Sequence, residues 1–202
     1  MIHLGMSGSL RVLTSQQTLT KHDHADFVFE NELVLRFRDP RRFGSIFWLD
    51  NEDDHVLLEK LGPEPLLGEF SAEYLFGRSR GRKVAIKQFI MNAQVVVGIG
   101  NIYANEALFL AGIRPGIAAS RISRGRCEYL VAAIKQVLRR AIEAGGTTLK
   151  DFVREDGSPG YFKQSLNVYG RGGEPCFNCQ ATLKEIRQGG RSTVYCAVCQ
   201  KG

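Results

Sequence analysis

The spacing of hydrophobic residues changes near residue 62, which divides the chain into a strand-rich part and a helix-rich part. Before the change, Leu33, Leu35 and Phe37 fall at every second position, as in a strand with one buried face. Gly5 and Gly8 interrupt an earlier strand pattern and indicate bulges or close backbone approaches. We expect antiparallel strands in a sandwich-like or barrel-like set at His3–Leu13, Ala25–Glu30, Leu33–Arg38 and Ser45–Leu49.

After Gly62-Pro63-Glu64-Pro65, a rigid candidate linker, apolar residues recur at helical spacing. The longest pattern places one apolar face on a helix over about Arg126–Ala144, which Gly145-Gly146 ends. Glu155–Gly173 is a long polar loop, of the kind that is often functional. Shorter helices are expected at Ser71–Gly77, Lys83–Met91, Ile102–Ala111 and Thr147–Val153, and the predicted fold class is α+β.

Four cysteines near the C-terminus form two C-x2-C pairs, Cys176 with Cys179 and Cys196 with Cys199, sixteen residues apart. Two such pairs supply the four thiolates of a tetrahedral zinc ion. The segment between them reads as a hairpin of Ala181–Ile186 and Arg191–Tyr195 with a basic tip. Spacing and charge leave two interpretations open: a zinc ion that only staples a small hairpin, or one that holds a tip for nucleic acid.

The amino-acid composition of the chain favours a polyanionic binding partner. The 202 residues contain 44% hydrophobic and 24% charged residues, ordinary values for a globular protein. Lys and Arg number 27 against 21 Asp and Glu, and the sequence pI is about 9.2. The run from Arg78 to Lys87 carries five cationic side chains and no acid, which indicates either phosphate binding or a solvated surface.

Cysteine usage and hydropathy indicate the compartment. The fifth cysteine, Cys127, lies in a helical pattern and is expected to be a small core residue. Two C-x2-C pairs (knuckles) together with a fifth, unpaired cysteine are typical of a protein in a reducing compartment. The sequence shows neither a basic leader nor the roughly 18 consecutive apolar residues of a membrane span. We therefore expect a cytoplasmic protein without membrane attachment.

Two short segments carry candidate chemistry. The turn Asp39–Gly44 presents Arg41, Arg42 and Phe43 together. Apolar wedges beside arginines enter the base stack in DNA-bending proteins, although Phe43 is equally explained as a buried staple of the turn. Asn101 follows a glycine-rich stretch at the start of a helix, where it could either bind a phosphate with the helix amides or serve as an N-cap.

Together these motifs resemble bacterial formamidopyrimidine-DNA glycosylase, in order and over essentially the whole chain. The matching stretches are His3–Gly8, Asp39–Gly44, Leu61–Pro65, Gly98–Tyr103, Gly160–Phe162 and Val168–Arg171, followed by the four-cysteine hairpin. The resemblance implies base-excision repair by a bifunctional glycosylase and AP lyase. Such an enzyme removes 8-oxoguanine and formamidopyrimidines from duplex DNA through a Schiff base and β,δ-elimination.

The resemblance also implies an organisation and a setting. Residues 1–60 would be a remnant of an N-terminal β-sandwich catalytic domain. Residues 61–170 would form a helix–two-turns–helix DNA-binding domain, in which about 155–170 cap the lesion, and residues 171–202 a zinc-finger hairpin. One structural Zn²⁺ ion, a monomeric state and a bacterial, nucleoid-associated location follow from the same resemblance.

Individual residues take roles from the resemblance. Met6, Arg41 and Phe43 would fill the gap left by the flipped nucleotide, with Arg41 facing the orphaned cytosine. Arg191 would hold a phosphate beside the lesion and donate the proton for δ-elimination. The further DNA contacts would come from His3, His22, Arg42, Lys83 and Asn101.

One feature of the family has no counterpart in the sequence. The family opens on Pro-Glu, whose proline amine is the nucleophile, and carries a lysine upstream of the His-Leu-Gly-Met motif, whereas this chain opens on Met1-Ile2. We expect that this chain lacks the nucleophile and retains weak DNA binding through its helical and zinc half, without glycosylase activity. The alternatives are a non-catalytic, zinc-dependent damaged-DNA-binding module and a zinc-ribbon structural protein of another assembly, and the latter leaves the Arg41–Phe43 turn unexplained.

Overall fold

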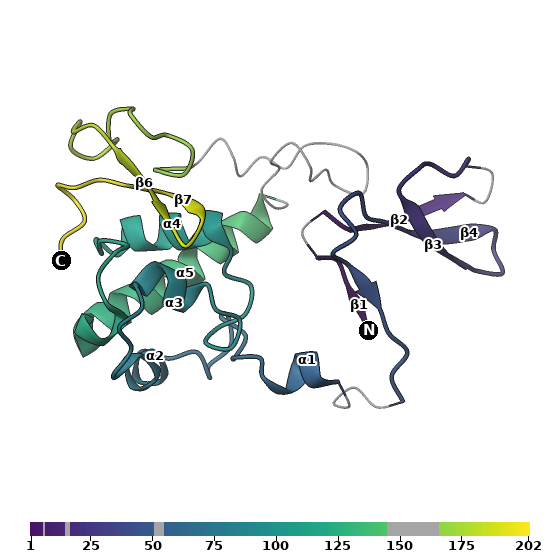
Figure 1. The fold of residues 1–202 in the computed structure, drawn as a ribbon, viewed down its shortest axis with the longest axis horizontal. Coiled ribbons are helices and arrows are strands. Elements are labelled where there is room, and N and C mark those ends of the chain that lie inside the picture. Colours follow the sequence, from purple (N-terminus) through teal and green to yellow (C-terminus); the bar gives the residue numbers. More distant parts are fainter. Residues whose placement is uncertain (6, 15–16, 51–54, 145–165) are drawn as a thin grey trace. The chain divides into compact units, whose positions relative to one another are not determined.

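A computed structural model describes residues 1–5, 7–14, 17–50, 55–144 and 166–202 of the chain (Figure 1). The described chain divides into two units. Unit 1 contains residues Met1–Glu59, and unit 2 contains Lys60–Ala144 together with the C-terminal residues from 166 onward. Each unit has its own secondary structure and is considered by itself.

Unit 1 is built on antiparallel strands. β2 (Ser9–Thr14), β4 (Leu33–Arg38) and β3 (Asp23–Val28) form a three-stranded sheet in that order. β1 (Ile2–His3) pairs with β5 (Ser45–Ile46) in a separate two-stranded sheet. Strand β4 lies in the centre of the larger sheet, and its predicted bounds are confirmed. The predicted buried face of Leu33, Leu35 and Phe37 is wrong in part, because Leu33 and Leu35 are only half-buried whereas Val34 and Arg36 on the other face are buried.

The predicted strand over His3–Leu13 is wrong, because the chain turns between β1 and β2. Gly5 has a φ of +61°, and a Cβ atom on Gly8 would lie 2.2 Å from the carbonyl oxygen of Leu4. Both glycines therefore mark the close backbone approaches that the sequence predicted. The expected strands at Ala25–Glu30 and Ser45–Leu49 also shift or shorten, and a short helix, α1 (Val56–Glu59), was not expected.

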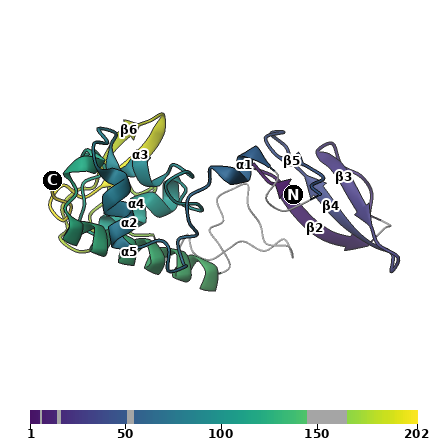
Figure 2. The ribbon, with the colours of Figure 1, turned by 90° about the horizontal axis from the view of Figure 1, so that it is seen from below.

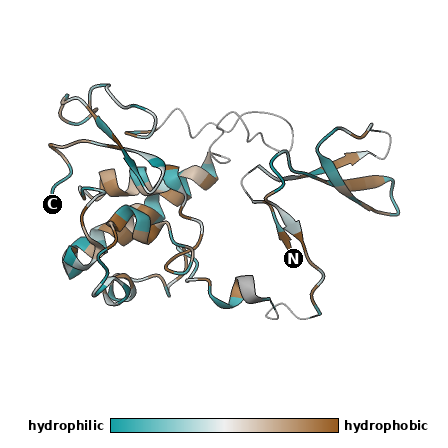
Figure 3. Cartoon of the chain, in the orientation of Figure 1, coloured by the Kyte–Doolittle hydropathy of each residue, from teal (hydrophilic) through white to brown (hydrophobic). Residues whose placement is uncertain are grey.

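Unit 2 is mainly helical. Its elements are α2 (Ala72–Ser79), α3 (Ile86–Ile90), α4 (Asn101–Leu110), the 3-10 turn Ala119–Arg121 and α5 (Arg124–Glu143). Ser71 and Ser123 cap α2 and α5, and each side-chain oxygen accepts a hydrogen bond from the backbone N–H three residues later. α5 packs against α2 and α4, and hydrophobic residues lie along α4 and α5 (Figure 2, Figure 3). The predicted apolar face of α5 is confirmed.

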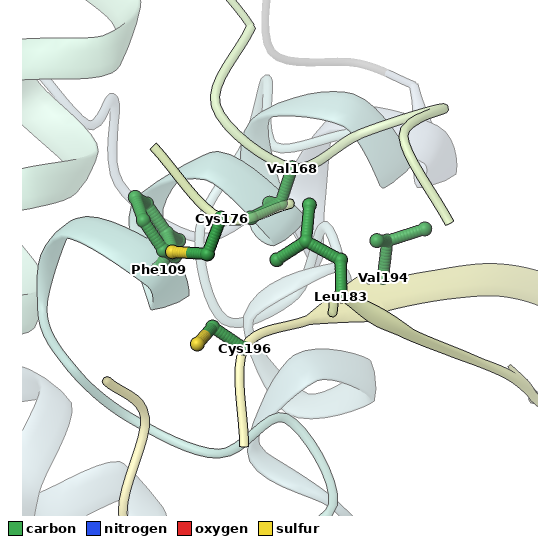
Figure 4. Packing of buried hydrophobic residues seen from close by; sticks show 6 residues of the cluster. All are labelled: Phe109, Val168, Cys176, Leu183, Val194 and Cys196. Carbon is green, nitrogen blue, oxygen red and sulfur yellow. The ribbon is translucent and has the colours of Figure 1, made fainter. Parts of the chain in front are cut away.

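The C-terminal hairpin belongs to unit 2 and packs on α4. β6 (Lys184–Gln188) pairs with β7 (Arg191–Tyr195) across Gly189-Gly190, both of which have positive φ. A small core joins the hairpin to the helix: Phe109 of α4 lies near Val168, Leu183, Val194, Cys176 and Cys196 (Figure 4). Strand β7 has the predicted bounds, whereas β6 begins three residues later than the expected Ala181.

Other expectations have simple outcomes. The described elements combine helices and antiparallel sheets, in agreement with the predicted α+β class. Cys127 is fully buried, which confirms it as a core residue. The expected helix Thr147–Val153 and most of the loop Glu155–Gly173 lie outside the described residues. Within the described ranges no helix is long and apolar enough to cross a bilayer.

A buried carboxylate joins α4 to the segment that precedes the zinc knuckles. Glu106 is 2% exposed, and its two oxygens accept four hydrogen bonds of 2.8–2.9 Å. The donors are the backbone N–H groups of Asn167, Val168 and Tyr169 and the side-chain amide of Asn167. Buried polar groups need such partners, so Glu106 fixes where the chain re-enters unit 2.

Replacing Glu106 with Ala should destabilise unit 2 strongly, because four donors lose their acceptor. We expect a loss of about 3–5 kcal/mol in the free energy of unfolding, measured by urea denaturation. Glu106→Gln keeps one acceptor oxygen and should cost roughly half as much. Glu143→Ala on the exposed end of α5 is the matched control and should change stability by less than about 0.5 kcal/mol. Equal stability of the Glu106→Ala and control proteins would contradict the assignment.

Candidate nucleic-acid interface and metal centre

In unit 1, the turn Asp39–Gly44 is organised by the carboxylate of Asp39. This side chain is 1% exposed and accepts hydrogen bonds from the Gly44 N–H at 2.7 Å and the Ser7 hydroxyl at 2.7 Å. The Arg41 N–H adds a third, longer bond of 3.3 Å. The Gly44 amide, followed by the Ser7 hydroxyl, holds the pKa of the Asp39 carboxyl below its usual range. The carboxylate thus closes the turn from inside.

The closed turn presents its other side chains to solvent. Arg41 and Arg42 are exposed, and Phe43 is 60% exposed, so the interpretation of Phe43 as a buried staple is wrong. Arg42 has a φ of +56°, a strained value for a residue with a side chain. Gly5 lies directly against the Phe43 backbone, because a Cβ on Gly5 would come within 2.6 Å of the Phe43 carbonyl carbon.

The other predicted DNA-contacting residues of unit 1 lie around this turn. His3 is exposed, and its carbonyl oxygen lies near Gly44. The carbonyl of His22 accepts a hydrogen bond from the Asp39 N–H at 3.0 Å. His24, to which the sequence assigned no role, contacts the Asp39 carbonyl through Nε2 at 2.9 Å. Met6 lies outside the described residues.

In unit 2, Asn101 begins α4 and reaches the zinc hairpin. Gly100 is the N-cap of α4, so the interpretation of Asn101 as an N-cap is wrong. The Asn101 amide nitrogen donates to the carbonyl of Ser192 at 3.1 Å, next to the exposed Arg191. The predicted phosphate contacts Asn101 and Arg191 therefore come together at one end of β7.

Lys87 holds the same part of β7 from α3. It is 1% exposed, and its amine donates to the Ser192 carbonyl at 2.9 Å and the Thr193 hydroxyl at 2.6 Å. Burial lowers the pKa of the Lys87 amine to about 8, and the charge of Arg191 adds to the effect. The predicted run of five cationic side chains from Arg78 to Lys87 thus loses one member to the interior.

A second cation of that run is also engaged within the protein. Arg80 lies 4.0 Å above the Phe76 ring and donates to the carbonyl of Ile122 at 2.7 Å. Arg78 likewise donates to the carbonyl of Gln94 at 3.1 Å, although it is exposed, as are Arg80, Arg82 and Lys83. The surface available to a polyanion is therefore smaller than the sequence indicated.

Sequence reasoning missed Asn105, which anchors the middle of β7. Asn105 is fully buried; its oxygen accepts the Val194 N–H at 2.8 Å, and its nitrogen donates to the Asn101 carbonyl at 2.6 Å. The available signal was the presence of Asn101, Asn105 and Glu106 in an otherwise apolar helix, because buried polar residues need dedicated partners.

The four cysteines of the two knuckles form a metal centre. Their sulfur atoms all lie within 4.8 Å of one another, with Cys176 and Cys199 at 3.9 Å and Cys179 and Cys196 at 3.4 Å. A tetrahedral ion with metal–sulfur bonds of about 2.3 Å separates its ligands by about 3.8 Å, so the geometry fits zinc. Four cysteine ligands complete the coordination shell, which makes the ion structural.

The electrostatics of the knuckles favour a bound cation. Burial raises the pKa of the Cys199 thiol, and the three neighbouring thiols raise it further, because crowded sulfurs resist ionisation together. Burial also opposes ionisation of Cys196, but the N–H groups of Cys199 and Val198 outweigh it and lower that pKa to about 7. A divalent ion removes the repulsion among four thiolates and stabilises the hairpin.

Three domain families match the chain. "Formamidopyrimidine-DNA glycosylase N-terminal domain" matches residues 1–46, "Formamidopyrimidine-DNA glycosylase H2TH domain" matches residues 61–153, and "Zinc finger found in FPG and IleRS" matches residues 173–202. The last match agrees with the four-cysteine geometry and supports one structural zinc ion.

Curated relatives and solved structures agree with these matches. The chain is 60% identical to formamidopyrimidine-DNA glycosylase of Alcanivorax borkumensis over 201 residues, covering 100% of this chain and 75% of the relative. It is 37% identical to the Thermus thermophilus MutM (Fpg) structure, with a TM-score of 0.89, covering 98% of this chain and 74% of that one. A Lactococcus lactis Fpg complex with abasic-site DNA is 32% identical, with a TM-score of 0.89 and coverages of 100% and 74%.

The pKa of Lys87 predicts a pH dependence of stability. Its folded pKa of about 8 lies below the ordinary 10.5, so the unfolded chain binds the proton more tightly between these values. The Lys87 contribution to stability should therefore rise with pH. Between pH 7.5 and 9.5 the free energy of unfolding of the native protein should gain about 2 kcal/mol relative to Lys87→Met.

The measurement is urea denaturation of the zinc-loaded proteins at both pH values. Lys83→Met removes an exposed lysine four residues away and should show no such gain. Parallel pH profiles for the native and Lys87→Met proteins would contradict the shifted pKa.

Proposed function

Because the chain belongs to the formamidopyrimidine-DNA glycosylase family, whose members act in DNA base-excision repair, we propose that it recognises duplex DNA containing oxidised purines. The observation that supports this proposal best is that Phe43 is exposed next to Arg42, on a turn that the buried carboxylate of Asp39 closes. The proposed lesions are chiefly 8-oxoguanine and formamidopyrimidines.

The turn in unit 1 is suited to replacing a flipped nucleotide. A base in a duplex is out of reach of chemistry until it leaves the stack, and the vacated space needs an apolar filler. Phe43 would wedge into the stack, and Arg41 would face the orphaned cytosine with its planar donors. The internal bonds of Asp39 would keep this turn rigid while it enters the DNA. Met6 remains the proposed third member.

Each unit carries residues that we propose contact DNA phosphates. His3, His22 and Arg42 lie on or beside the turn of unit 1, and Lys83, Asn101 and Arg191 belong to unit 2. One hydrogen of the Asn101 amide is used on Ser192, and the second is available to a phosphate oxygen. Arg191 would stabilise the departing phosphate as an anion and donate the proton of δ-elimination.

The zinc ion would take no part in the reaction itself and would only hold the hairpin that carries Arg191 in place. Cys176, Cys179, Cys196 and Cys199 hold the ion, which supplies the cross-link that a hairpin of this size needs. The residues of the chain then fix the direction of Arg191, because Asn101 and Lys87 both bond Ser192 beside it. The proposed setting is a monomer acting at the nucleoid of a bacterial cytoplasm.

Phe43→Ala and Lys83→Ala should affect DNA binding in different ways. Phe43→Ala should weaken binding to a duplex with 8-oxoguanine roughly tenfold and leave undamaged duplex nearly unchanged, because a stacked aromatic contributes about 1–3 kcal/mol. Lys83→Ala should weaken both duplexes and reduce the slope of log Kd against log salt by about 0.9, the value for one phosphate. Fluorescence anisotropy from 50 to 200 mM salt measures both effects. No effect of either change would favour the zinc-ribbon alternative.

A non-catalytic damaged-DNA-binding function is the second candidate. It is favoured by the exposed side chains of Arg42 and Phe43, which would contact DNA without taking part in bond cleavage.

Under this non-catalytic function, the 202-residue polypeptide should bind an 8-oxoguanine duplex without forming a Schiff base. Borohydride reduction should trap no covalent complex, and denaturing electrophoresis should show no strand cleavage. The Alcanivorax borkumensis relative is the positive control. A trapped complex of this polypeptide would exclude the non-catalytic function.

A further inference from the structure

A basic pocket lies in unit 1 next to the Asp39–Gly44 turn. It has a volume of about 340 Å³ and is lined by Ser7, Ser9, Arg11, Arg38, Pro40 and Arg41. Three of these residues are cationic and none is acidic. Only Arg41 among them has a role in the functions considered above.

Strand register brings the pocket's side chains together. Ser9 of β2 is paired directly opposite Arg38 of β4, and Arg11 lies two residues further along β2 on the same face of the sheet. Arg41 follows β4 on the turn that Asp39 closes. The fold thus places side chains from two strands and one turn around one hollow, which sequence spacing alone does not indicate.

The acids nearest to the pocket are already engaged. Asp26 forms a two-pronged ion pair with Arg36, with both bonds at 2.9 Å. Asp23, the strand partner of Arg38, lies 3.6 Å from the same guanidinium and accepts two hydrogen bonds from Thr20. Burial raises the pKa of the Asp23 carboxyl, but the Thr20 bonds outweigh it and lower the pKa, with smaller contributions from the charges of Arg36 and Arg38. Asp39 accepts hydrogen bonds from the Gly44 amide, the Ser7 hydroxyl and the Arg41 N–H.

Two cations of the pocket, Arg11 and Arg38, retain donors for a ligand. Within the described part of the chain, Arg11 and Arg38 donate no hydrogen bond to another residue, although both are half-buried. Guanidinium groups that share a small hollow repel one another, so an anion that enters it is stabilised by all of them. A phosphate matches the fork of an arginine in geometry and in charge.

We propose that this pocket binds one backbone phosphate of the DNA strand that passes beside the Asp39–Gly44 turn. The inference rests on the proposed function, because Arg41 belongs to both the pocket and the turn that would enter the base stack. A strand that meets Phe43 continues past Arg41, and Arg38 and Arg11 would grip its phosphate, with the Ser9 hydroxyl as a further donor. The contact fixes the register of the turn on the duplex and carries no base information.

The experiment measures the salt dependence of DNA binding for Arg38→Gln, Arg11→Gln and the double variant. One phosphate contributes about 0.9 to the slope of log Kd against log salt. The double variant should lose about 0.9 in total, and each single variant should lose no more than that, because both arginines grip the same phosphate. The ratio of affinities for 8-oxoguanine and undamaged duplexes should not change. A loss of about 1.8 in the double variant would assign two phosphates and overturn the shared pocket.

Two controls separate charge from structure. Arg38→Lys retains the positive charge and should restore most of the slope, whereas a purely structural role of the guanidinium would not be rescued. Arg139→Gln removes an exposed charge from α5 of unit 2 and should leave the slope at the native value. Thermal unfolding of every variant verifies that unit 1 is folded.

A second measurement tests the pocket without DNA. Inorganic phosphate is titrated into the native protein while the Nε–H signals of Arg11 and Arg38 are followed by NMR. If native slopes persist in all variants but phosphate shifts these signals at low millimolar concentration, the pocket binds free phosphate and the DNA assignment is overturned. If neither occurs, the pocket is no anion site. If the native protein binds no DNA, the proposed function fails, and shifts of these signals decide separately whether the pocket binds phosphate.

Discussion

The C-terminal half of unit 2 depends on one interaction, the acceptance of four N–H donors by the buried carboxylate of Glu106. The donors belong to residues about sixty positions further along the chain. These hydrogen bonds therefore stabilise the fold only when that segment packs against α4. An unpaired buried carboxylate is far more costly than an unmade surface contact. The same helix holds β7, the strand that begins at Arg191, through Asn105 and Asn101, and Lys87 of α3 adds a further bond to it.

Unit 1 uses a similar device on a smaller scale. Asp39 is buried beneath its own turn and bonded to Ser7 and Gly44, and the side chains of Arg41 and Phe43 extend outward. In both units a satisfied buried polar group stabilises the backbone while exposed cations remain available for a ligand. This separation suits a DNA glycosylase, because a residue that enters the base stack must not lose its own conformation on entry.

The sequence predicted those features correctly that depend only on the spacing of residues close together in the chain. The bounds of β4 and β7, the apolar face of α5 and the four zinc ligands agree with the structure. The predicted strand across Gly5 and Gly8 was wrong, because glycines at a positive φ or a close approach allow a turn that a strand pattern conceals.

The sequence by itself determined the family and the metal centre, since each is encoded in short spacings, whereas it left open whether Phe43 is buried or exposed. Only the tertiary structure decided that Lys87 is buried against Thr193, 106 residues away, that Asn105 anchors β7, and that Arg11 and Arg38 share a pocket. A charged or amide side chain has the same sequence signature whether it is solvated or buried. Its partner comes from a distant segment, and only folding brings that partner within hydrogen-bonding distance.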